Sequence, residues 1–334
     1  MRDTAYGRTI RLAAGGFLFA VSLTLSVAAS DVRAEDYPSR PITIVTSVPP
    51  GGSVDALARV TAEKLREKWG QPVVVENRPG ASGNIGIGAV ERSASDGYTF
   101  LFNPGAHLAV NKILFPTASS DPDNLVPVSR LATNPLVLVV NPQVPAKTLQ
   151  EFVAYAKAHP GKLNYASGGN GGMPHLAAEM FDMKAGVKMT KVTFRGIAPA
   201  MVGLVSGQVD LIFVDISTAI PHIRSGKLRV LGVASEKRHP VLPDTPALTE
   251  LYPGLTAETW FAVSAPPKTP ADIVHKVSAA IAEATMQPDV QKRLQNMGNI
   301  EAIGSTPEEM ATFIRKERER WGAVIRNLGM SVGN

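Results

Sequence analysis

Two patterns of apolar residues follow one another along this chain: short consecutive runs, and longer stretches with an apolar residue at every third or fourth position. The runs are typical of strands buried on both faces, and the longer stretches of amphipathic helices. Predicted strands are 42–48, 72–76, 98–102, 136–140, 163–167, 191–194, 209–214, 229–234 and 260–265. Predicted helices are 54–69, 85–94, 149–159, 174–185, 198–206, 220–225, 271–286, 289–297 and 307–328. This alternation predicts an α/β fold whose parallel sheet is covered by helices on both faces.

The predicted strands fall into two series, and the last three helices follow no strand of their own. Those helices must therefore pack on a sheet made earlier in the chain. We predict a discontinuous first domain, residues 35–133 plus 258–334, and a second domain, residues 134–257. The chain would cross between them near Thr133 and near Ala257, the second crossing being placed to within about twenty residues. Two such crossings would form a hinge.

The N-terminal residues 1–34 have the pattern of a targeting segment. A basic start precedes the uncharged apolar run from Leu12 to Ala29, and residues 32–34, Val-Arg-Ala, fit a small-residue cleavage site. The alternative is an uncleaved membrane anchor, but the glycines and the Ser and Thr residues within the run count against it. We expect export with cleavage near Ala34.

Composition narrows the range of functions. The 334 residues include no cysteine, so an exported form must be stable from its core alone, without disulfides. The net charge of +5 is dispersed and forms no basic block, which argues against nucleic-acid binding. A weak positive excess suits a small anionic ligand.

Glycine-rich helix starts follow two of the predicted strands. In parallel α/β sheets ligands bind outside the carboxyl ends of the strands, and these two loops, Pro50–Ser53 and Ser167–Gly172, lie there, one in each predicted domain. Free N–H groups and the positive end of a helix dipole favour an anion. A dicarboxylate could be held between the two helix starts without a salt bridge. The alternative for the first loop is simply a tight turn.

Side chains at the same strand ends allow two interpretations each. Ser53 and Ser167 either belong to the site or cap their helices, and Asn170 could serve only to form a left-handed turn. Arg195 either lies on the surface or faces the cleft and attracts anions. Asp215 either caps the segment after it or meets a ligand amine or hydroxyl.

Enzyme signatures are missing from the sequence. It has no Gly-x-Gly-x-x-Gly after a strand, no Gly-x-Ser-x-Gly and no His-Glu-x-x-His, and its six histidines lie far apart. We therefore predict no catalytic residue, no metal site and no cofactor. A secreted α/β hydrolase is the alternative of a different class, with Ser167, His175 and Asp215 as the nearest approach to a triad. His175 is instead interpreted as a buried, hydrogen-bonded residue, and Asp55 as a partner of its helix dipole.

Several short motifs, in this order and spacing, resemble the tripartite tricarboxylate transporter substrate-binding family, the Bug proteins of the bacterial periplasm. The resemblance covers essentially the whole mature chain. The motifs are Pro50-Gly-Gly with Asp55, Gly70-Gln-Pro-Val-Val-Val-Glu-Asn-Arg78, Gly80-Ala-Ser-Gly83, Asp96-Gly-Tyr-Thr-Phe100, Ala156-Lys-Ala-His-Pro-Gly161, His175-Leu-Ala, Phe194-Arg-Gly196, Gly226-Lys-Leu-Arg229, Leu242-Pro-Asp-Thr-Pro246 and Pro266-Pro-Lys-Thr-Pro270.

The resemblance implies a two-domain periplasmic-binding-protein fold, type II-like, with the ligand in a cleft between the domains. It implies a monomer that captures a small carboxylate: a dicarboxylate or tricarboxylate, an acidic amino acid or an aromatic acid. The partner would be a membrane permease or, alternatively, a sensor kinase. Family members grip the carboxylate through backbone amides and ordered water, at loops that correspond here to Val48–Ser53 and Ser167–Gly172.

The motifs and the strand ends together define the predicted ligand-binding residues. These are Val48, Pro50, Gly51, Gly52, Ser53, Asn103, Ser167, Gly168, Gly169, Asn170, Gly172, Arg195 and Asp215. The chain departs from the family pattern at Val48, where an aromatic residue is frequent, and in the glycine content of Ser167–Gly172. Met173-Pro174 before His175 is also atypical. These departures leave the identity of the carboxylate open.

Overall fold

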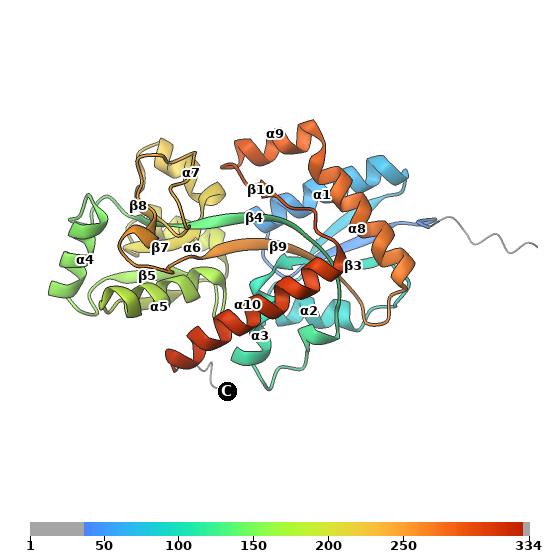
Figure 1. The fold of residues 1–334 in the computed structure, drawn as a ribbon, viewed down its shortest axis with the longest axis horizontal. Coiled ribbons are helices and arrows are strands. Elements are labelled where there is room, and N and C mark those ends of the chain that lie inside the picture. Colours follow the sequence, from blue (N-terminus) through green and yellow to red (C-terminus); the bar gives the residue numbers. More distant parts are fainter. Residues whose placement is uncertain (1–36, 330–334) are drawn as a thin grey trace, which may run out of the picture. The chain divides into compact units, whose positions relative to one another are not determined.

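The computed structural model describes residues 37–329 of the protein, and the predicted leader, residues 1–34, lies outside this part. Two compact units are distinguished, Met1–Ser39 and Arg40–Asn334. Only residues 37–39 of the first unit are described. All helices and strands below belong to the second unit (Figure 1).

Strands and helices alternate along most of this unit. The strands are β1 (Ile42–Thr46), β2 (Val73–Asn77), β3 (Thr99–Pro104), β4 (Val126–Val140), β5 (Asn164–Ser167), β6 (Thr190–Thr193), β7 (Leu211–Asp215), β8 (Arg229–Val233), β9 (Glu258–Ala265) and β10 (Glu301–Ala302). The α-helices are α1 (Ser53–Trp69), α2 (Asn84–Glu91), α3 (Ala106–Leu114), α4 (Leu149–Ala158), α5 (Met173–Ala185), α6 (Ile197–Val205), α7 (Ile216–Arg224), α8 (Ala271–Met286), α9 (Pro288–Asn296) and α10 (Pro307–Asn327). Short 3-10 helices are η1 (Ala81–Gly83), η2 (Pro122–Asn124) and η3 (Leu248–Glu250).

Helix α1 shows how the local sequence sets an element. Its predicted apolar face is buried from Val54 to Leu65, while Trp69 is partly exposed. Gly70 adopts a φ of 66° and donates its N–H to Arg66 O at 2.9 Å, which closes the helix as predicted. Each large apolar side chain buried in this way contributes about 1.5–3 kcal/mol to folding.

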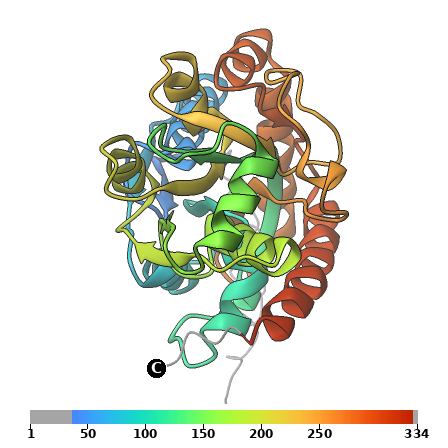
Figure 2. The same cartoon turned by 90° about the vertical axis from the view of Figure 1, so that its left-hand side faces the viewer.

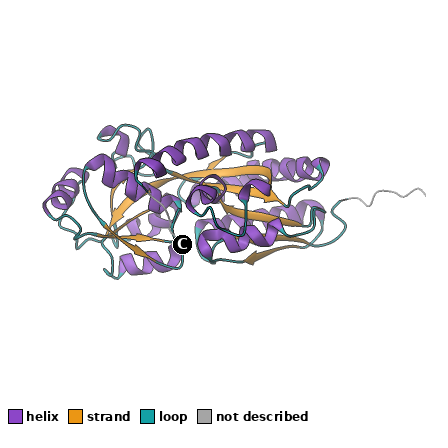
Figure 3. Ribbon diagram, turned by 90° about the horizontal axis from the view of Figure 1, so that it is seen from below, coloured by secondary structure: helices purple, strands orange, loops and turns teal. Residues whose placement is uncertain are grey.

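The strands form one mixed sheet in the order β2-β1-β3-β9-β4-β7-β5-β6, with β8 and β10 also paired to β4. β1, β2 and β3 are parallel to one another, as are β5, β6 and β7. The prediction of a wholly parallel sheet is wrong, because β4 and β9 run antiparallel to their neighbours. The two parallel groups are called lobe 1 (β1–β3 with α1–α3 and α8–α10) and lobe 2 (β5–β8 with α4–α7). Figure 2 looks onto lobe 2, and Figure 3 shows helices on both sides of the strands.

Strand β4 is much longer than the predicted 136–140, because it begins at Val126. Its first part pairs with β9, and its register shifts between Pro127 and Ser129 and again between Arg130 and Ala132. Proline within a run argues against a strand unless a bulge accommodates it. The sequence therefore did not predict this part of β4.

The two predicted crossings of the chain lie side by side in the structure. Thr133 of β4 is paired with Trp260 of β9, and Leu136 N–H donates to Ala257 O at 2.9 Å. β4 then continues into lobe 2, where it pairs with β7 and β8. Figure 1 shows β4 and β9 running together between the two lobes. The domain limits at residues 133 and 257 stay predictions.

The C-terminal helices pack on elements from the first part of the chain. α8 packs against α1 and β4, and α10 against α3 and β4. Trp321 of α10 is fully buried, as is Trp260 of β9, in an apolar core that extends through both lobes. One correction applies to this region: the two-residue strand β10 follows α9 and pairs with Thr133 and Ala132 of β4.

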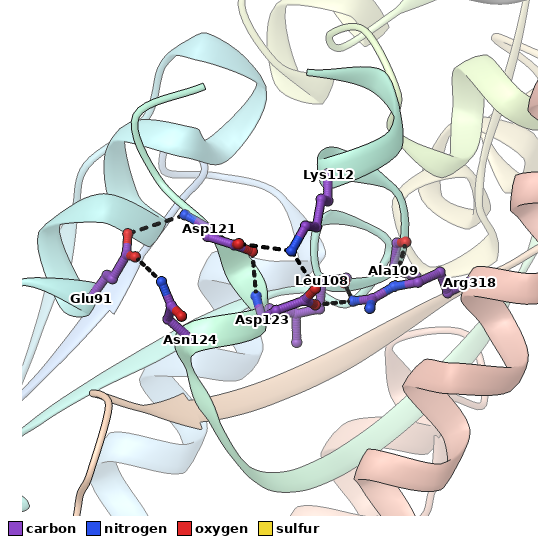
Figure 4. A network of polar contacts seen from close by, with 8 residues as sticks. All are labelled: Glu91, Leu108, Ala109, Lys112, Asp121, Asp123, Asn124 and Arg318. Carbon is purple, nitrogen blue, oxygen red and sulfur yellow. Dashed lines mark hydrogen bonds and ion pairs between the residues drawn. The ribbon is translucent and has the colours of Figure 1, made fainter. Parts of the chain in front are cut away.

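A polar network fixes helix α3, which the sequence did not predict, against α10 (Figure 4). The Arg318 guanidinium donates to Leu108 O at 3.0 Å and to Ala109 O at 3.4 Å, and it pairs with Asp123. Lys112 of α3 donates to Asp123 Oδ2 at 2.9 Å. Residues 106–111 of α3 are all buried, so its first turns lack a solvent-exposed face.

Candidate ligand-binding cleft

A cavity of about 560 Å³ lies between the lobes at the ends of the parallel strands. Both lobes contribute to its wall. The lining residues are 47–50, 52–54, 79–83, 104–107, 168–170, 172–174, 193–198, 215, 259 and 260. Of the predicted site residues, Gly51, Asn103 and Ser167 are not among them, and the remaining ten are.

The loop between β1 and α1 is braced by Asp55 beneath it. Asp55 Oδ2 accepts from Gly51 N–H at 3.2 Å, and Asp55 Oδ1 accepts from Arg59 at 3.0 Å and from Asn77 at 2.9 Å. Burial acts to raise the pKa of the Asp55 carboxyl, but the hydrogen bonds from Arg59, Asn77 and Gly51 outweigh it and hold this pKa below its usual value. Asp55 therefore does more than the expected interaction with the helix dipole, because its carboxylate also accepts a hydrogen bond from Gly51 N–H.

The start of α1 still presents donors to the cavity. Its N-cap is Gly52, which has no side chain to cap the helix. The first intrahelical hydrogen bond is donated by Ala56 N–H to Gly52 O at 3.0 Å. Ser53 and Val54, whose N–H groups precede that bond, line the cavity. Ser53 occupies the first helical position and does not cap the helix.

The loop between β5 and α5 presents a second helix start. Its N-cap is Gly172, whose carbonyl accepts the first helical bonds from His175 and Leu176, so Met173 N–H precedes them. Ser167 lies below the cavity and bonds to its own loop, its Oγ donating to Gly169 O at 2.7 Å. The capping role considered for Ser167 is therefore wrong. Asn170 accepts from Lys191 Nζ at 3.0 Å at the cavity wall.

His175 is buried and hydrogen-bonded, as predicted. It is 3% exposed, and its Nδ1 accepts from Gly171 N–H at 3.1 Å. Its Nε2 lies 3.6 Å from Glu179 Oε1, and the His175 ring holds the pKa of the Glu179 carboxyl below its usual range. Ser167 and Asp215 bond to other groups, so the three residues considered as a hydrolase triad do not form one.

A third helix start at the cavity was not predicted. α6 begins after Gly196, whose φ of 117° suits only glycine, and its first backbone bond runs from Ala200 N–H to Gly196 O at 3.4 Å. Ile197 and Ala198 therefore bring two more uncommitted helix-start N–H groups to the wall. A signal existed in the sequence, since Gly196 follows a strand and precedes an apolar helix. Arg195, beside it, lines the cavity and is exposed.

The cavity walls approach each other closely at several glycines. A Cβ on Gly196 would lie 2.9 Å from Pro49 Cγ, and one on Gly171 would lie 2.4 Å from Leu114 Cδ1. Pro49 and Leu114 belong to lobe 1, and both glycines to lobe 2. Only glycine at these two positions allows the lobes to approach this closely.

Asp215 and Asn103 differ in their access to the cavity. Asp215 caps α7, accepting from Ser217 Oγ at 2.5 Å and from Thr218 Oγ1 at 2.8 Å, and it also lines the cavity. Asn103 is fully buried in β3, opposite Ala262. No described residue hydrogen-bonds its amide group.

The lobe 1 wall carries His107 and Trp260, which the sequence did not single out. His107 is 7% exposed, its Nδ1 lies 3.3 Å from Ser47 Oγ, and burial lowers its pKa to about 4. Trp260 packs over Gly105 and against Phe313, with ring centroids 5.1 Å apart. Of the described residues lining the cavity, the only basic side chain besides His107 is Arg195, and the only acidic one is Asp215.

The chain matches the tripartite tricarboxylate transporter family receptor, TctC, over residues 57–330. The protein belongs to the TctC family. The family prediction made from the motifs is thus confirmed, and so is the two-domain periplasmic-binding-protein fold with a cleft between the domains. TctC proteins are receptors, that is, binding proteins.

Relatives of this TctC protein include the Bordetella pertussis protein BugT, 39% identical over 304 residues, covering 90% of this chain and 93% of BugT. An R. palustris protein solved with adipate has a TM-score of 0.85 and 32% identity, covering 89% of this chain and 99% of its own. MatC from Rhodopseudomonas palustris, solved with bound malate, has a TM-score of 0.81 and 33% identity, covering 86% and 100%.

Two further observations concern the described part of this TctC protein. Within residues 37–329, no helix combines the length and apolar character needed to cross a bilayer. In the same range, no three His, Asp or Glu side chains are grouped so that they could hold a metal ion.

Proposed function

We propose that this protein is a periplasmic receptor that captures a small carboxylate in the cleft by closure of its lobes and passes it to a tripartite tricarboxylate transporter permease. The observation that carries the proposal is the convergence of three helix starts, those of α1, α5 and α6, on one cavity. Similar proteins hold the carboxylates adipate and malate. Export would follow cleavage near Ala34.

The carboxylate would be bound mainly by main-chain groups. Each helix N-terminus favours a negative charge by about 0.3–1 kcal/mol when exposed and by up to about 2 kcal/mol when partly buried. Each charge-assisted hydrogen bond adds about 1.5–3 kcal/mol. Three helix starts therefore supply enough binding energy to hold a carboxylate without a dedicated arginine.

We assign the ligand contacts to the predicted residues that line the cavity. They are Val48, Pro50, Gly52, Ser53, Gly168, Gly169, Asn170, Gly172, Arg195 and Asp215. Gly51 and Ser167 would act indirectly, because each is bonded within its own loop. Asn103 would support the lobe 1 wall from within.

Closure would occur about the paired segments near Thr133 and Ala257, where the chain passes twice between the lobes. A ligand shifts such an equilibrium only by its difference in affinity for the two states. Here that difference would arise because α1 belongs to one lobe and α5 and α6 to the other. A carboxylate meets all three helix starts only in the closed form.

Thermal unfolding of the mature protein, stripped of ligand by unfolding and refolding, tests the proposal against a panel of carboxylates. A true ligand at about 100 times its dissociation constant adds about 2.7 kcal/mol of stability, a shift of several degrees. The matched controls are the corresponding amides and alcohols without any carboxylate, which should give no shift. Stabilisation by no carboxylate in the panel would overturn the proposal.

A further inference from the structure

His107 is a buried ring on the cleft wall with one nitrogen committed and one uncommitted. Its Nδ1 lies 3.3 Å from Ser47 Oγ, and a Cβ on Gly83 would come within 2.3 Å of that nitrogen and 2.6 Å of Cε1. This edge of the ring is therefore packed against lobe 1. Within the described residues, Ser47 is the sole hydrogen-bond partner of the ring, so Nε2 has no partner. Nε2 is also not one of the polar atoms that are both fully buried and without a partner, so it is accessible. Nε2 is therefore open to the cavity that His107 lines.

The first turn of α3 holds the ring in this position. The Arg318 guanidinium donates to Leu108 O at 3.0 Å, directly after His107, and α3 is tied through Lys112 to Asp123 (Figure 4). Gly83, with a φ of 88°, leaves the space that the imidazole fills. The side chain is thus pre-positioned before any ligand enters.

The electrostatics of this wall disfavour a second charge on the ligand. Burial lowers the pKa of His107 to about 4, so the imidazole is neutral at pH 7. Among the described lining residues, the cation is Arg195, which belongs to lobe 2 and is exposed, and the acid is Asp215. A buried carboxylate without a cation is far more costly than a buried amide or hydroxyl that finds a hydrogen-bond partner.

We propose that His107 is a specificity-determining residue, whose Nε2 hydrogen-bonds the far end of the ligand and selects acids that carry one carboxylate and an uncharged hydrogen-bonding group at the other end. The body between the two ends is apolar, because Met173, Phe194 and Trp260 line the same cavity. This inference rests on the proposed function, since it takes the first carboxylate to lie at α1, α5 and α6.

A matched set of ligands tests the selectivity. The probes are dicarboxylates of four to eight carbons and benzene-1,4-dicarboxylate, each paired with its own monoamide. The amide has nearly the shape of the carboxylate and can both donate and accept, so it suits either tautomer of His107. Isothermal titration at pH 7.5 should show a monoamide binding at least about tenfold more tightly than its dicarboxylate.

Two isosteric variants separate ligand contact from structural support. His107→Gln places an amide near the position of Nε2, and His107→Asn places one near Nδ1, beside Ser47. If His107 contacts the ligand, His107→Gln keeps most of the preference for the monoamide, and His107→Asn loses it. Ser47→Ala removes the Nδ1 partner, whose residue also lines the cavity, and a preference set by Nε2 should survive this change.

The outcomes distinguish the two proposals. No binding of any carboxylate would overturn the proposed function, and this inference with it. Two results would overturn the selectivity alone. In one, the dicarboxylates bind as tightly as their monoamides or more tightly; in the other, the protein binds other acids but none that carries an uncharged group at its far end. If His107→Asn kept the preference for the monoamide and His107→Gln lost it, the ring would only support Ser47. Melting curves of the unliganded variants identify any variant that fails to fold.

Discussion

Gly196 of lobe 2 faces Pro49 of lobe 1 so closely that a Cβ on the glycine would lie 2.9 Å from Pro49 Cγ. The contact joins the loop before α6 to the loop before α1, and both loops line the cleft. Any side chain at residue 196 would hold these two loops apart. The lobes could then not approach as they do in this structure.

Gly196→Ala should therefore weaken carboxylate binding by roughly 5- to 150-fold, equivalent to the 1–3 kcal/mol typical of an overpacked contact. Gly226→Ala is the matched control, because Gly226 also has a positive φ, 70°, but has no atom within 4 Å of its Cβ position. Both variants should lose stability, and only Gly196→Ala should lose affinity in titration. Equal affinities in the two variants would contradict a role for this contact in closure.

The main-chain donors at α1 can be tested by removing one of them. Ser53 is the first helical residue and follows an extended Gly52, so Ser53→Pro fits the helix start and deletes one N–H. Loss of one charge-assisted hydrogen bond should weaken carboxylate binding about 10- to 100-fold. Ala271→Pro makes the same change at the exposed start of α8 and should leave affinity unaltered. A Ser53→Pro protein with full affinity would show that this N–H does not bind the ligand.

Asp55 should contribute to stability through its charge. Its pKa in the folded protein lies below its unfolded value, so its contribution is present above about pH 4 and is lost as pH falls through the lowered folded pKa. Asp55→Asn should cost about 1–3 kcal/mol at pH 7 in urea unfolding, and the difference from wild type should shrink in acid. Asp272→Asn, in the first turn of α8, is the control and should cost less than about 1 kcal/mol. A pH-independent difference for Asp55→Asn would contradict the ionic role.

Burial of neutral His107 should make the protein less stable in mild acid. The pKa of His107 falls from 6.5 to about 4 on folding, so the unfolded chain binds the extra proton and stability decreases as pH falls from about 6.5 toward 4. The expected loss from this group is about 1 kcal/mol at pH 5.5 and about 2 to 3 kcal/mol at pH 4.5. His107→Gln should remove this part of the pH dependence of urea unfolding, while His275→Gln, at an exposed position, should not. If the free energies of unfolding of wild type and His107→Gln changed with pH in the same way, this prediction would be wrong.

The elements that the sequence predicted well are those with strong local signals. Helix α8 begins and ends where predicted, and Gly70 closes α1 because a left-handed residue is needed there. The glycine-rich loops before α1 and α5 were identified as helix starts at strand ends, and both line the cavity. These features depend on a few neighbouring residues, so the sequence alone carries them.

The elements that were missed depend on distant contacts. The first part of β4 contains Pro127 and Pro135, and it is a strand only because β9 pairs with it through two register shifts. His107 packs against Gly83, and Trp260 packs against Gly105. In each pair the two residues are distant in the sequence. Their chain positions give no periodic signal, and only the folded arrangement shows what they line.

The helix starts that face the cleft have an evolutionary consequence. Point mutation exchanges side chains but leaves peptide N–H groups in place unless it introduces proline. If the carboxylate lies at these helix starts, as proposed, that part of the cleft would resist mutational drift, whereas the part built from side chains such as His107 would be free to vary. Descendants of one such receptor would then acquire new ligands by changing those side chains alone, while the main-chain groups that bind the acid stayed in place.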